Sequence, residues 1–202
     1  VGGATSTISI ATRAGDDTIT LSGIDLASNT TSQAIKITAG KGADTLSIGT
    51  ARIGAGATAS ANIIIADGDS LEGSRDKITG FEDGDGTNFA DNLVFASTAA
   101  VASLSTSTDY GVIKSHTVTT GVVLFDDAAS YASELIINSG NLSDVLGYLE
   151  ANTASGVSAA FEYDSVGDGA NDATMVWNNG TKNSLVELVG LTGSTSISTT
   201  SK

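Results

Sequence analysis

The stretch "AGDDTITLSGIDL", residues 14–26, has a close counterpart in "GKGADTLSIGTARI", residues 40–53. Each contains a glycine corner followed by Asp-Thr, and the two aspartates, Asp17 and Asp44, lie 27 residues apart. After each aspartate an apolar residue recurs at every second position, which is the period of a strand with one buried face. The repeated stretch therefore predicts a turn that leads into a short strand, used more than once along the chain.

A second strand precedes each of these turns, because pairs of isoleucines recur with similar spacing. The second pair follows the first by 27 residues and the third follows the second by 28; the pairs are Ile8 and Ile10, Ile35 and Ile37, and Ile63 and Ile65. A third corner strand starts at Asp76 in "DKITGF". One unit thus consists of a strand, a Gly-Asp turn and a strand. Such units bury their apolar sides by stacking in parallel, which predicts a parallel β-helix or β-roll over residues 1–90.

The aspartates of these corners are candidate calcium ligands. Glycine lets the chain adopt positive φ in a tight corner, and stacked corners bring carboxylate and carbonyl oxygens of neighbouring units around one point. These are the ligands that Ca²⁺ prefers. The candidates in the repeated part are Asp16, Asp17, Gly40, Gly42, Asp44, Asp67, Asp69 and Asp76. The alternative is that these aspartates only terminate turns, which is a common use of Asp.

Two further loops have the composition of an oxygen-rich cation site. In "FEDGDG", Asp83 and Asp85 alternate with glycines, but this is not an EF-hand, since the twelfth position from Asp83 is Val94 instead of Glu. A solvated turn is the alternative there. The second loop could equally be a plain hairpin turn. It spaces three aspartates four residues apart: Asp164, Asp168 and Asp172.

The composition limits the possible partners. The net charge is −14, and the stretch between Lys114 and Lys182 contains nine acidic residues and no Lys or Arg. Such a stretch repels itself unless cations neutralise it. No basic face for a nucleic acid is visible, and no apolar run approaches the length of a membrane span. The chain has no Cys, which excludes thiolate metal sites and thiol catalysis. Its start resembles no secretory signal and is typical of the interior of a longer protein.

From residue 91 the rhythm changes, and we predict a second, β-rich (α+β) capping domain over residues 91–202. Its helix should run from about residue 142 to 153, with Asn141 or Ser143 as the cap. The segment "AASYASELI" is a candidate for a second helix. Strand-like runs with period two follow one another along this half: "NLVF", "TTGVVLFDD", "GVSAAFEYD", "ATMVWNN" and "SLVELVGL".

The turn motif resembles the RTX-type calcium-binding repeats of proteins exported by type I secretion. That family repeats the nonapeptide Gly-Gly-x-Gly-x-Asp-x-(apolar)-x without interruption, whereas here one match occurs per 27 residues. Near the end, "DSVGDGANDATMVW" and "SLVELVGLTG" resemble the family's Asp-rich loop and terminal strands. The resemblance implies Ca²⁺ as the cofactor and an uncleaved secretion signal in the C-terminal domain. It rests on Gly15, Asp17, Ile19, Gly40, Gly42, Asp44 and Leu46.

Among such exported proteins, the acidic, Thr- and Ala-rich, Cys-free composition looks most like that of bacterial surface-layer (S-layer) proteins. This resemblance implies a secreted structural protein that self-associates into a homo-oligomer or lattice at the extracellular cell surface, with a cell-surface polysaccharide as a further partner. Two alternatives stay open. An adhesin or ice-binding β-solenoid is indicated by outward-facing Thr18, Thr20 and Thr45. The other is the noncatalytic secretion tail of a larger hydrolase.

Motifs for catalysis are scarce, and we expect no enzymatic activity. A Ser-His-Asp triad would have to use His116, the only histidine. The surrounding "IKSHTVTT" is typical of an ordinary strand, so an exposed or hydrogen-bonded histidine is the better interpretation. The chain contains neither a zinc-binding His-Glu-x-x-His helix nor a phosphate-binding loop. Met175 and Trp177 lie on one face of a predicted strand, which indicates core packing.

Overall fold

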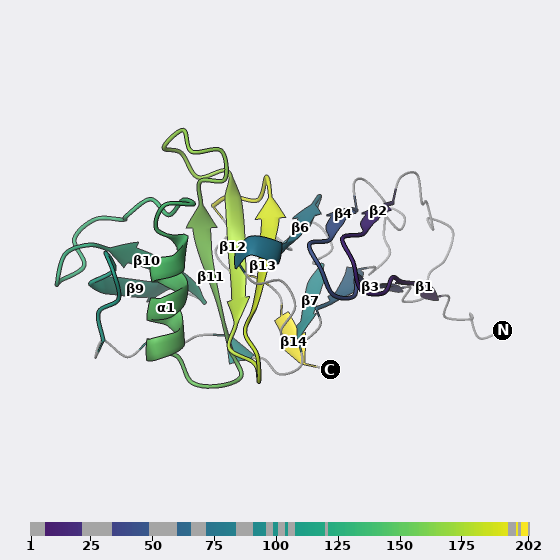
Figure 1. The fold of residues 1–202 in the computed structure, drawn as a ribbon, viewed down its shortest axis with the longest axis horizontal. Helices are drawn as coiled ribbons and strands as arrows, with labels where there is room; N and C mark the ends of the chain where they lie inside the picture. The colour runs from purple at the N-terminus through teal and green to yellow at the C-terminus, as the bar shows by residue number, and fades with distance from the viewer. Residues whose placement is uncertain are drawn as a thin grey trace.

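Strands dominate the part of the protein that the computed structural model describes, namely residues 7–21, 34–48, 60–65, 72–83, 91–95, 99–100, 104, 108–119, 121–193, 197 and 199–201. This part contains one α-helix, α1 (Leu142–Asn152), and one 3-10 helix, η1 (Glu72–Ser74). The predicted mainly β class is thus confirmed (Figure 1). The strands are β1 (Thr7–Ala11), β2 (Thr18–Thr20), β3 (Ala34–Thr38), β4 (Thr45–Ser47), β5 (Ser60–Ile64), β6 (Asp76–Thr79), β7 (Asn92–Phe95), β8 (Ala99–Ala100), β9 (Ser115–Thr119), β10 (Val122–Asp126), β11 (Val157–Tyr163), β12 (Ala173–Asn178), β13 (Ser184–Val189) and β14 (Thr199–Ser201).

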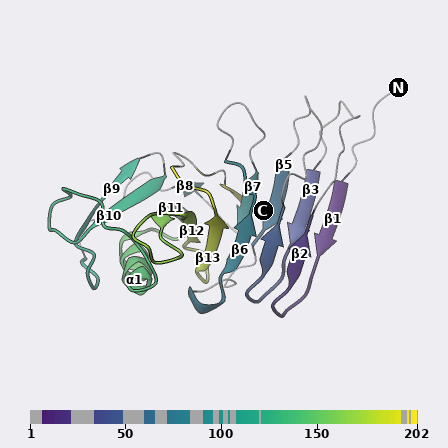
Figure 2. The same cartoon turned by 90° about the horizontal axis from the view of Figure 1, so that it is seen from above.

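The strands form two sheets. The small sheet has the order β1-β3-β5-β7-β14, and all of its pairs are parallel. The large sheet has the order β2-β4-β6-β13-β12-β11-β10-β9, with β8 beside β11. Its first four strands are parallel, and β13, β12 and β11 then alternate in direction. Seen from above, the strands of the N-terminal half follow one another along the molecule and lead into β13 (Figure 2).

The repeated sequence determines the register of the first strands. In the large sheet Thr18 pairs with Thr45 and Thr45 with Lys77, so the Asp-Thr and Asp-Lys corners align as predicted. In the small sheet Ile8 pairs with Ile35, which confirms the first 27-residue step. Alternate residues of these strands point inward. The isoleucines among them are buried in β2, β3 and β6, whereas Ile8 and Ile10 of β1 are partly buried.

The predicted register of the third isoleucine pair is wrong by two residues. Ile63 pairs with Ile37, and Ala61 takes the place opposite Ile35. A shift by two residues keeps the same side chains on the buried face, whereas a shift by one would expose them. The apolar pattern alone therefore fixes the face of a strand and leaves a two-residue ambiguity in its register.

The large sheet lies between two hydrophobic clusters. One cluster joins it to the small sheet and includes Ile37, Ile63, Ile78 and Val186. The other joins its opposite face to α1 and includes Val145, Leu149 and Trp177, together with Met175 on the same strand face. The predicted core role of Met175 and Trp177 is confirmed by their exposed fractions of 0% and 2%. Because both faces are covered, all six residues of β12 are buried, not every second one as its period predicted.

The C-terminal half corrects two further expectations. Helix α1 is present close to its predicted bounds, but Asn141 forms no side-chain cap; its Oδ1 instead accepts a hydrogen bond from the backbone N–H of Asn138. The segment "AASYASELI" is not a helix. Its backbone N–H groups at Ala132 and Ser133 donate to the Asp126 carboxylate, so a side chain satisfies donors that a helix would have paired internally.

The division at residues 90 and 91 stays a prediction. Hydrogen-bonded pairs cross it in both sheets, because β7 pairs with β5 and β6 pairs with β13. Among the described residues no helix is both long and apolar enough to span a membrane.

Truncation of Ile63 should test the packing between the two sheets. Ile63 has no exposed surface, so Ile63→Ala should lower the free energy of unfolding by about 2–5 kcal/mol through lost burial and the cavity left behind. Ile64→Ala, on the outward face of the same strand and only half-buried, should lower it by much less. Urea unfolding of both variants measures the difference, and equal losses would contradict the assigned faces.

Candidate functional site

The Gly-Asp corners stack directly on one another. The backbone N–H of Gly15 donates to the carbonyl of Lys41 at 2.7 Å, and the N–H of Lys41 donates to the carbonyl of Arg13 at 3.2 Å. Gly40 and Gly42 have φ angles of 103° and 138°. A Cβ atom would lie 1.8 Å from the Arg13 carbonyl oxygen at Gly40 and 2.5 Å from that of Gly15 at Gly42. Both glycines are therefore needed for the close approach of the two corners.

The aspartates of the corners link each turn to the preceding one. The Oδ1 atom of Asp44 accepts a hydrogen bond from the backbone N–H of Asp17 at 2.8 Å. One unit further along, Oδ1 of Asp76 accepts from the N–H of Asp44 at 3.0 Å. We call this arrangement of Asp17, Asp44 and Asp76 the aspartate ladder. Asp44 and Asp76 are each only 1% exposed, so these carboxylates lie inside the stacked corners and not on their outer surface.

A second contact of this type runs in the opposite direction. Oδ1 of Asp16 accepts from the backbone N–H of Ala43 at 2.9 Å, and Asp16 is exposed. Each of the two corners thus provides a carboxylate that accepts from the backbone of the other: the buried Asp44 accepts from Asp17, and the exposed Asp16 accepts from Ala43. Asp16, Asp17, Gly40, Gly42 and Asp44 come together as the calcium interpretation expects, although the contacts present join carboxylates to backbone N–H groups.

Asp76 belongs to this group through its contact with the N–H of Asp44. The other predicted ligands lie in other segments of the chain. Within the described ranges no three His, Cys, Asp or Glu residues are arranged so that they could hold a metal ion. Asp83 lies at the end of the described segment 72–83 and is half-buried. Asp67, Asp69 and Asp85 lie outside the described residues.

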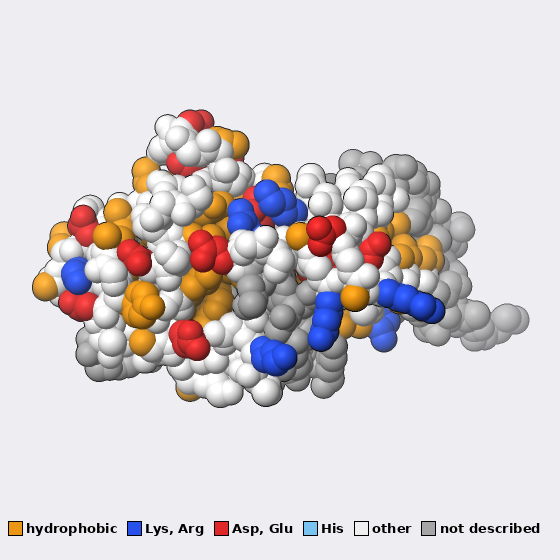
Figure 3. Space-filling model, viewed as in Figure 1, with side chains coloured by type: hydrophobic (Ala, Val, Ile, Leu, Met, Phe, Trp, Pro, Cys, Tyr) orange, Lys and Arg blue, Asp and Glu red, His pale blue; other side chains and the backbone are white. Residues whose placement is uncertain are grey.

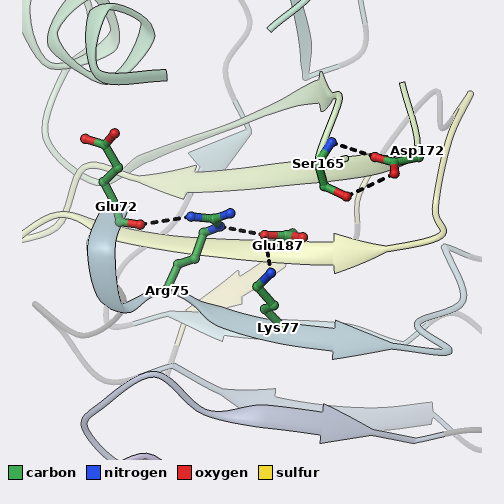
Figure 4. A network of polar contacts seen from close by, with 6 residues as sticks. All are labelled: Glu72, Arg75, Lys77, Ser165, Asp172 and Glu187. Carbon is green, nitrogen blue, oxygen red and sulfur yellow. Dashed lines mark hydrogen bonds and ion pairs between the residues drawn. The ribbon is translucent and has the colours of Figure 1, made fainter. Parts of the chain in front are cut away.

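The Asp-rich loop between β11 and β12 is organised by two of its three aspartates. Oδ1 of Asp164 accepts from the N–H of Gly167 at 2.6 Å and Oδ2 from that of Gly169 at 2.8 Å. Asp172 accepts from the N–H and hydroxyl groups of Ser165 at 2.7 and 3.0 Å (Figure 4). Asp168 is exposed and accepts from the N–H of Ala170. These carboxylates shape the loop through backbone donors.

Hydrogen bonding decides the protonation of Asp164. Burial raises the pKa of its carboxyl, but the backbone N–H groups of Gly169, Gly167 and Asp168 outweigh that effect, and the pKa lies below its ordinary value. Asp126 behaves in the same way: hydrogen bonds from the N–H groups of Ala132, Ser133 and Ala128 lower its pKa to about 2. Asp126 was not among the predicted site residues.

Asp91 is a second residue that the candidate ligands did not include. It precedes β7 on the inward side, opposite Ala61, as the pairing of Asn62 with Asn92 requires. Its Oδ1 accepts from the N–H of Ala61 at 2.9 Å and its Oδ2 from the N–H of Glu82 at 3.0 Å. Burial raises the pKa of Asp91 to about 6, and the two hydrogen bonds lower it only in part.

A buried ion pair joins the repeated strands to the C-terminal half. Glu187 of β13 is 1% exposed, and its Oε2 lies 2.6 Å from Nε of Arg75 and 3.5 Å from Nζ of Lys77 (Figure 4). Lys77 and Glu187 are direct neighbours in the β6–β13 register. The Arg75 guanidinium also lies over the ring of Tyr163, 5.5 Å from its centroid. The sequence does contain a signal for this ion pair: Glu187 is the single acidic residue in the apolar strand "SLVELVGL", and a buried carboxylate usually requires a cation as its partner.

His116 is hydrogen-bonded to a tyrosine of helix α1. It lies on β9, and its Nδ1 is 2.7 Å from the hydroxyl oxygen of Tyr148. Burial lowers the pKa of the imidazole, and the two rings meet edge to face with centroids 5.7 Å apart. The expectation of a hydrogen-bonded histidine on a strand is confirmed.

Comparison of the chain with models of protein families, with curated proteins and with solved structures finds no match in any of the three.

Substitution of Asp44 separates a turn role from a metal role. Measured in chelator, Asp44→Asn should leave stability nearly unchanged, since an amide oxygen still accepts from the Asp17 N–H. Asp44→Ala should cost about 1–3 kcal/mol, because a buried donor loses its partner. Calcium affinity, measured by calorimetry, should fall in both variants if the carboxylate is also a ligand, and more strongly for Ala. Asp109→Ala, which removes an exposed carboxylate elsewhere, should change neither quantity.

Asp91 should give the protein a distinctive pH dependence. Its folded pKa is raised from 3.8 to about 6, so its contribution to stability is complete below the unfolded pKa and is lost as pH rises through the folded one. Asp91→Asn removes this loss. The stability of the variant relative to wild type should therefore rise by at most roughly 3 kcal/mol between about pH 4 and pH 7.5. Urea unfolding at both pH values tests this, with Asp109→Asn as control; a pH-independent difference would refute it.

Proposed function

We propose that this chain is the structural, noncatalytic C-terminal portion of an exported, calcium-dependent surface-layer protein. The observation that carries the proposal is the aspartate ladder, in which corners of one sequence type stack in parallel with a carboxylate at each corner. In the finer description that we propose, β1 to β7 form a degenerate β-helix or β-roll, each unit being one rung, and the C-terminal strands cap it. The RTX-like sequence of the corners supports the assignment to proteins of type I secretion.

The charge of the protein supports a cation as its cofactor. The chain has 23 acidic and 9 basic residues, and Asp44 and Asp76 bring carboxylates into buried corners. Hydrogen bonds from N–H groups stabilise such charges but leave the net charge in place. Ca²⁺ would neutralise it with the carboxylate and carbonyl oxygens that the corners offer. Asp16, Asp17 and Asp44 lie in adjacent stacked corners, and we propose that they bind the ion together with corner carbonyl oxygens. Their three carboxylates alone are not arranged as a metal site, so ion binding would have to draw them closer together.

Calcium then couples folding to location. In a compartment with scarce calcium, repulsion among the carboxylates lowers the stability of the folded state, so that the chain unfolds more easily for export. At the millimolar calcium of an extracellular medium, the ions bind the folded state and stabilise it by mass action. The folded chains then self-associate at the cell surface, where we propose calcium and a polysaccharide as further partners.

One observation favours a second candidate, an ice-binding or adhesive surface. Thr18 and Thr45 are exposed and adjacent in the large sheet, and Thr20, Ser47 and Thr79 form a parallel column. Columns of small hydroxyl side chains at strand spacing form a flat, regular surface. The first column ends at Lys77, whose ammonium group pairs with Glu187, so the surface is short.

The calcium proposal predicts a strong and selective stabilisation. If millimolar calcium exceeds the dissociation constant about a hundredfold, the folded state gains roughly 3 kcal/mol, which raises the Tm of a chain of this length by about 5–10 °C. Magnesium should do much less, since it keeps its waters and requires a tight octahedron. Calorimetry in calcium, magnesium and chelator measures Tm, and sedimentation velocity in the same buffers measures assembly.

Identical melting and sedimentation in all three buffers would refute the calcium-dependent surface-layer proposal. Thermal hysteresis of freezing, without any response to calcium, would favour the ice-binding candidate instead.

A further inference from the structure

A hollow of about 290 Å³ lies where η1 of the repeated part meets α1 and the start of β13. Its volume is at the lower end of the range for small-ligand sites, so it suits a small molecule or one side chain. It is lined by Glu72, Tyr110, Ser143, Leu146, Gly147, Glu150, Trp177, Asn183, Ser184 and Leu185. None of these lining residues is basic.

The ring of Tyr110 lies at the rim of this hollow and is held there by contacts with α1. Tyr110 is 47% exposed, yet its ring packs so closely on α1 that a Cβ atom at Gly147 would lie 2.3 Å from its Cε1 atom. Glycine inside a helix is destabilising by roughly 0.5–1 kcal/mol relative to alanine. Gly147 therefore lowers the stability of α1, and it is the residue that makes space for the half-exposed ring of Tyr110.

The backbone on both sides of Tyr110 is fixed to the same helix. Oδ2 of Asp144 accepts from the N–H of Val112 at 3.0 Å, and Nδ2 of Asn152 donates to the carbonyl of Thr108 at 2.9 Å. Tyr110 and Ile113 also exchange two backbone hydrogen bonds across the intervening turn. The ring is thus positioned before any ligand arrives, which reduces the ordering cost of binding.

Two carboxylates give the hollow a negative charge. Glu72 comes from η1 and Glu150 from the exposed side of α1, and neither forms an ion pair within the described part of the chain. The nearby Arg75 does not neutralise Glu72. Its guanidinium binds Glu187 and the backbone carbonyl of Glu72, while the Glu72 carboxylate points away from it (Figure 4). Acidic and apolar side chains also surround α1 on the face in Figure 3.

We propose that this hollow binds an organic cation, namely a guanidinium or ammonium group on a short carbon chain. The positive group would lie between the Glu72 and Glu150 carboxylates and against the face of Tyr110, where a cation–π contact adds to the charge attraction. The carbon chain would pack on Leu146 and Trp177. Such a group can come from a free metabolite-sized amine or from an Arg or Lys side chain of another polypeptide. This site is independent of the aspartate ladder and of calcium.

Calorimetric titration of the 202-residue chain in chelator tests the site with two probes, agmatine and Nα-acetylargininamide. We expect a single site that 1 M salt weakens, because exposed charges are screened at that ionic strength. Glu150→Gln and Tyr110→Ala should each weaken binding by about fivefold. Glu134→Gln removes the same charge from an exposed glutamate outside the hollow and should leave the affinity unchanged. Circular dichroism verifies that each variant is folded.

The two probes separate the possible sources of the cation. Binding of both supports a site that accepts an arginine side chain of another chain, whereas binding of agmatine alone supports a free amine. Tyr110→Phe, which keeps the ring, should bind like wild type. The proposal is refuted if neither probe binds, if Glu134→Gln weakens binding as much as Glu150→Gln, or if neutral methyl glucoside binds as tightly as agmatine.

Discussion

The structure depends on hydrogen bonds from backbone N–H groups to aspartate carboxylates. They occur between stacked corners at Asp44 and Asp76, at the start of β7 at Asp91, and in the loops after β10 and β11 at Asp126 and Asp164. The chain has neither Pro nor Cys to fix its turns, and its acids far outnumber its bases. Ion pairs can therefore satisfy only a few carboxylates. Backbone N–H groups bind the carboxylates named above, through charge-assisted hydrogen bonds that are stronger than bonds between neutral groups.

The balance between burial and backbone donors decides whether a carboxylate is stable as an anion. Burial is the largest influence on the pKa of Asp91, and hydrogen bonds are the largest at Asp126. Three N–H groups lower the pKa of Asp126 to about 2, so its contribution is present above the unfolded pKa and is lost only as pH falls through the folded one. Asp91 has two donors and a neighbouring Glu82, and its pKa is raised to about 6. The same interaction thus favours the ionised state at one end of the large sheet and does not fully offset burial in the small sheet. Near neutral pH the stacked strands contain a carboxylate whose ionisation opposes folding.

Much of the fold follows from local patterns in the sequence. The repeated Asp-Thr corners predicted the order and register of β2, β4 and β6, and the apolar period predicted most strands of the C-terminal half. Each error concerns a contact that the local apolar pattern does not specify. The predicted pairing of Ile63 was two residues from the observed one, because both registers bury the same face of the strand. The segment after Asp126 formed a loop because a carboxylate outside it took its N–H groups. Both faces of β12 are buried because sheet and helix cover it from opposite sides.

The candidate site was predictable in its residue types and less so in its contacts. Gly40, Gly42 and Asp44 were identified from their spacing, and the close approach of the corners explains why those glycines are required. Asp91 and Glu187 were not identified, because neither lies in a repeated motif and the sequence does not show which groups oppose them; Arg75 and Glu187 are 112 residues apart. The aspartate ladder does not by itself exclude a cation, because an ionised carboxylate has two oxygens and about four acceptor positions. One oxygen can hold the preceding corner while the same charge attracts an ion. A ladder of this kind would align the oxygens of adjacent corners before the ion binds, so that calcium would act on corners already in register.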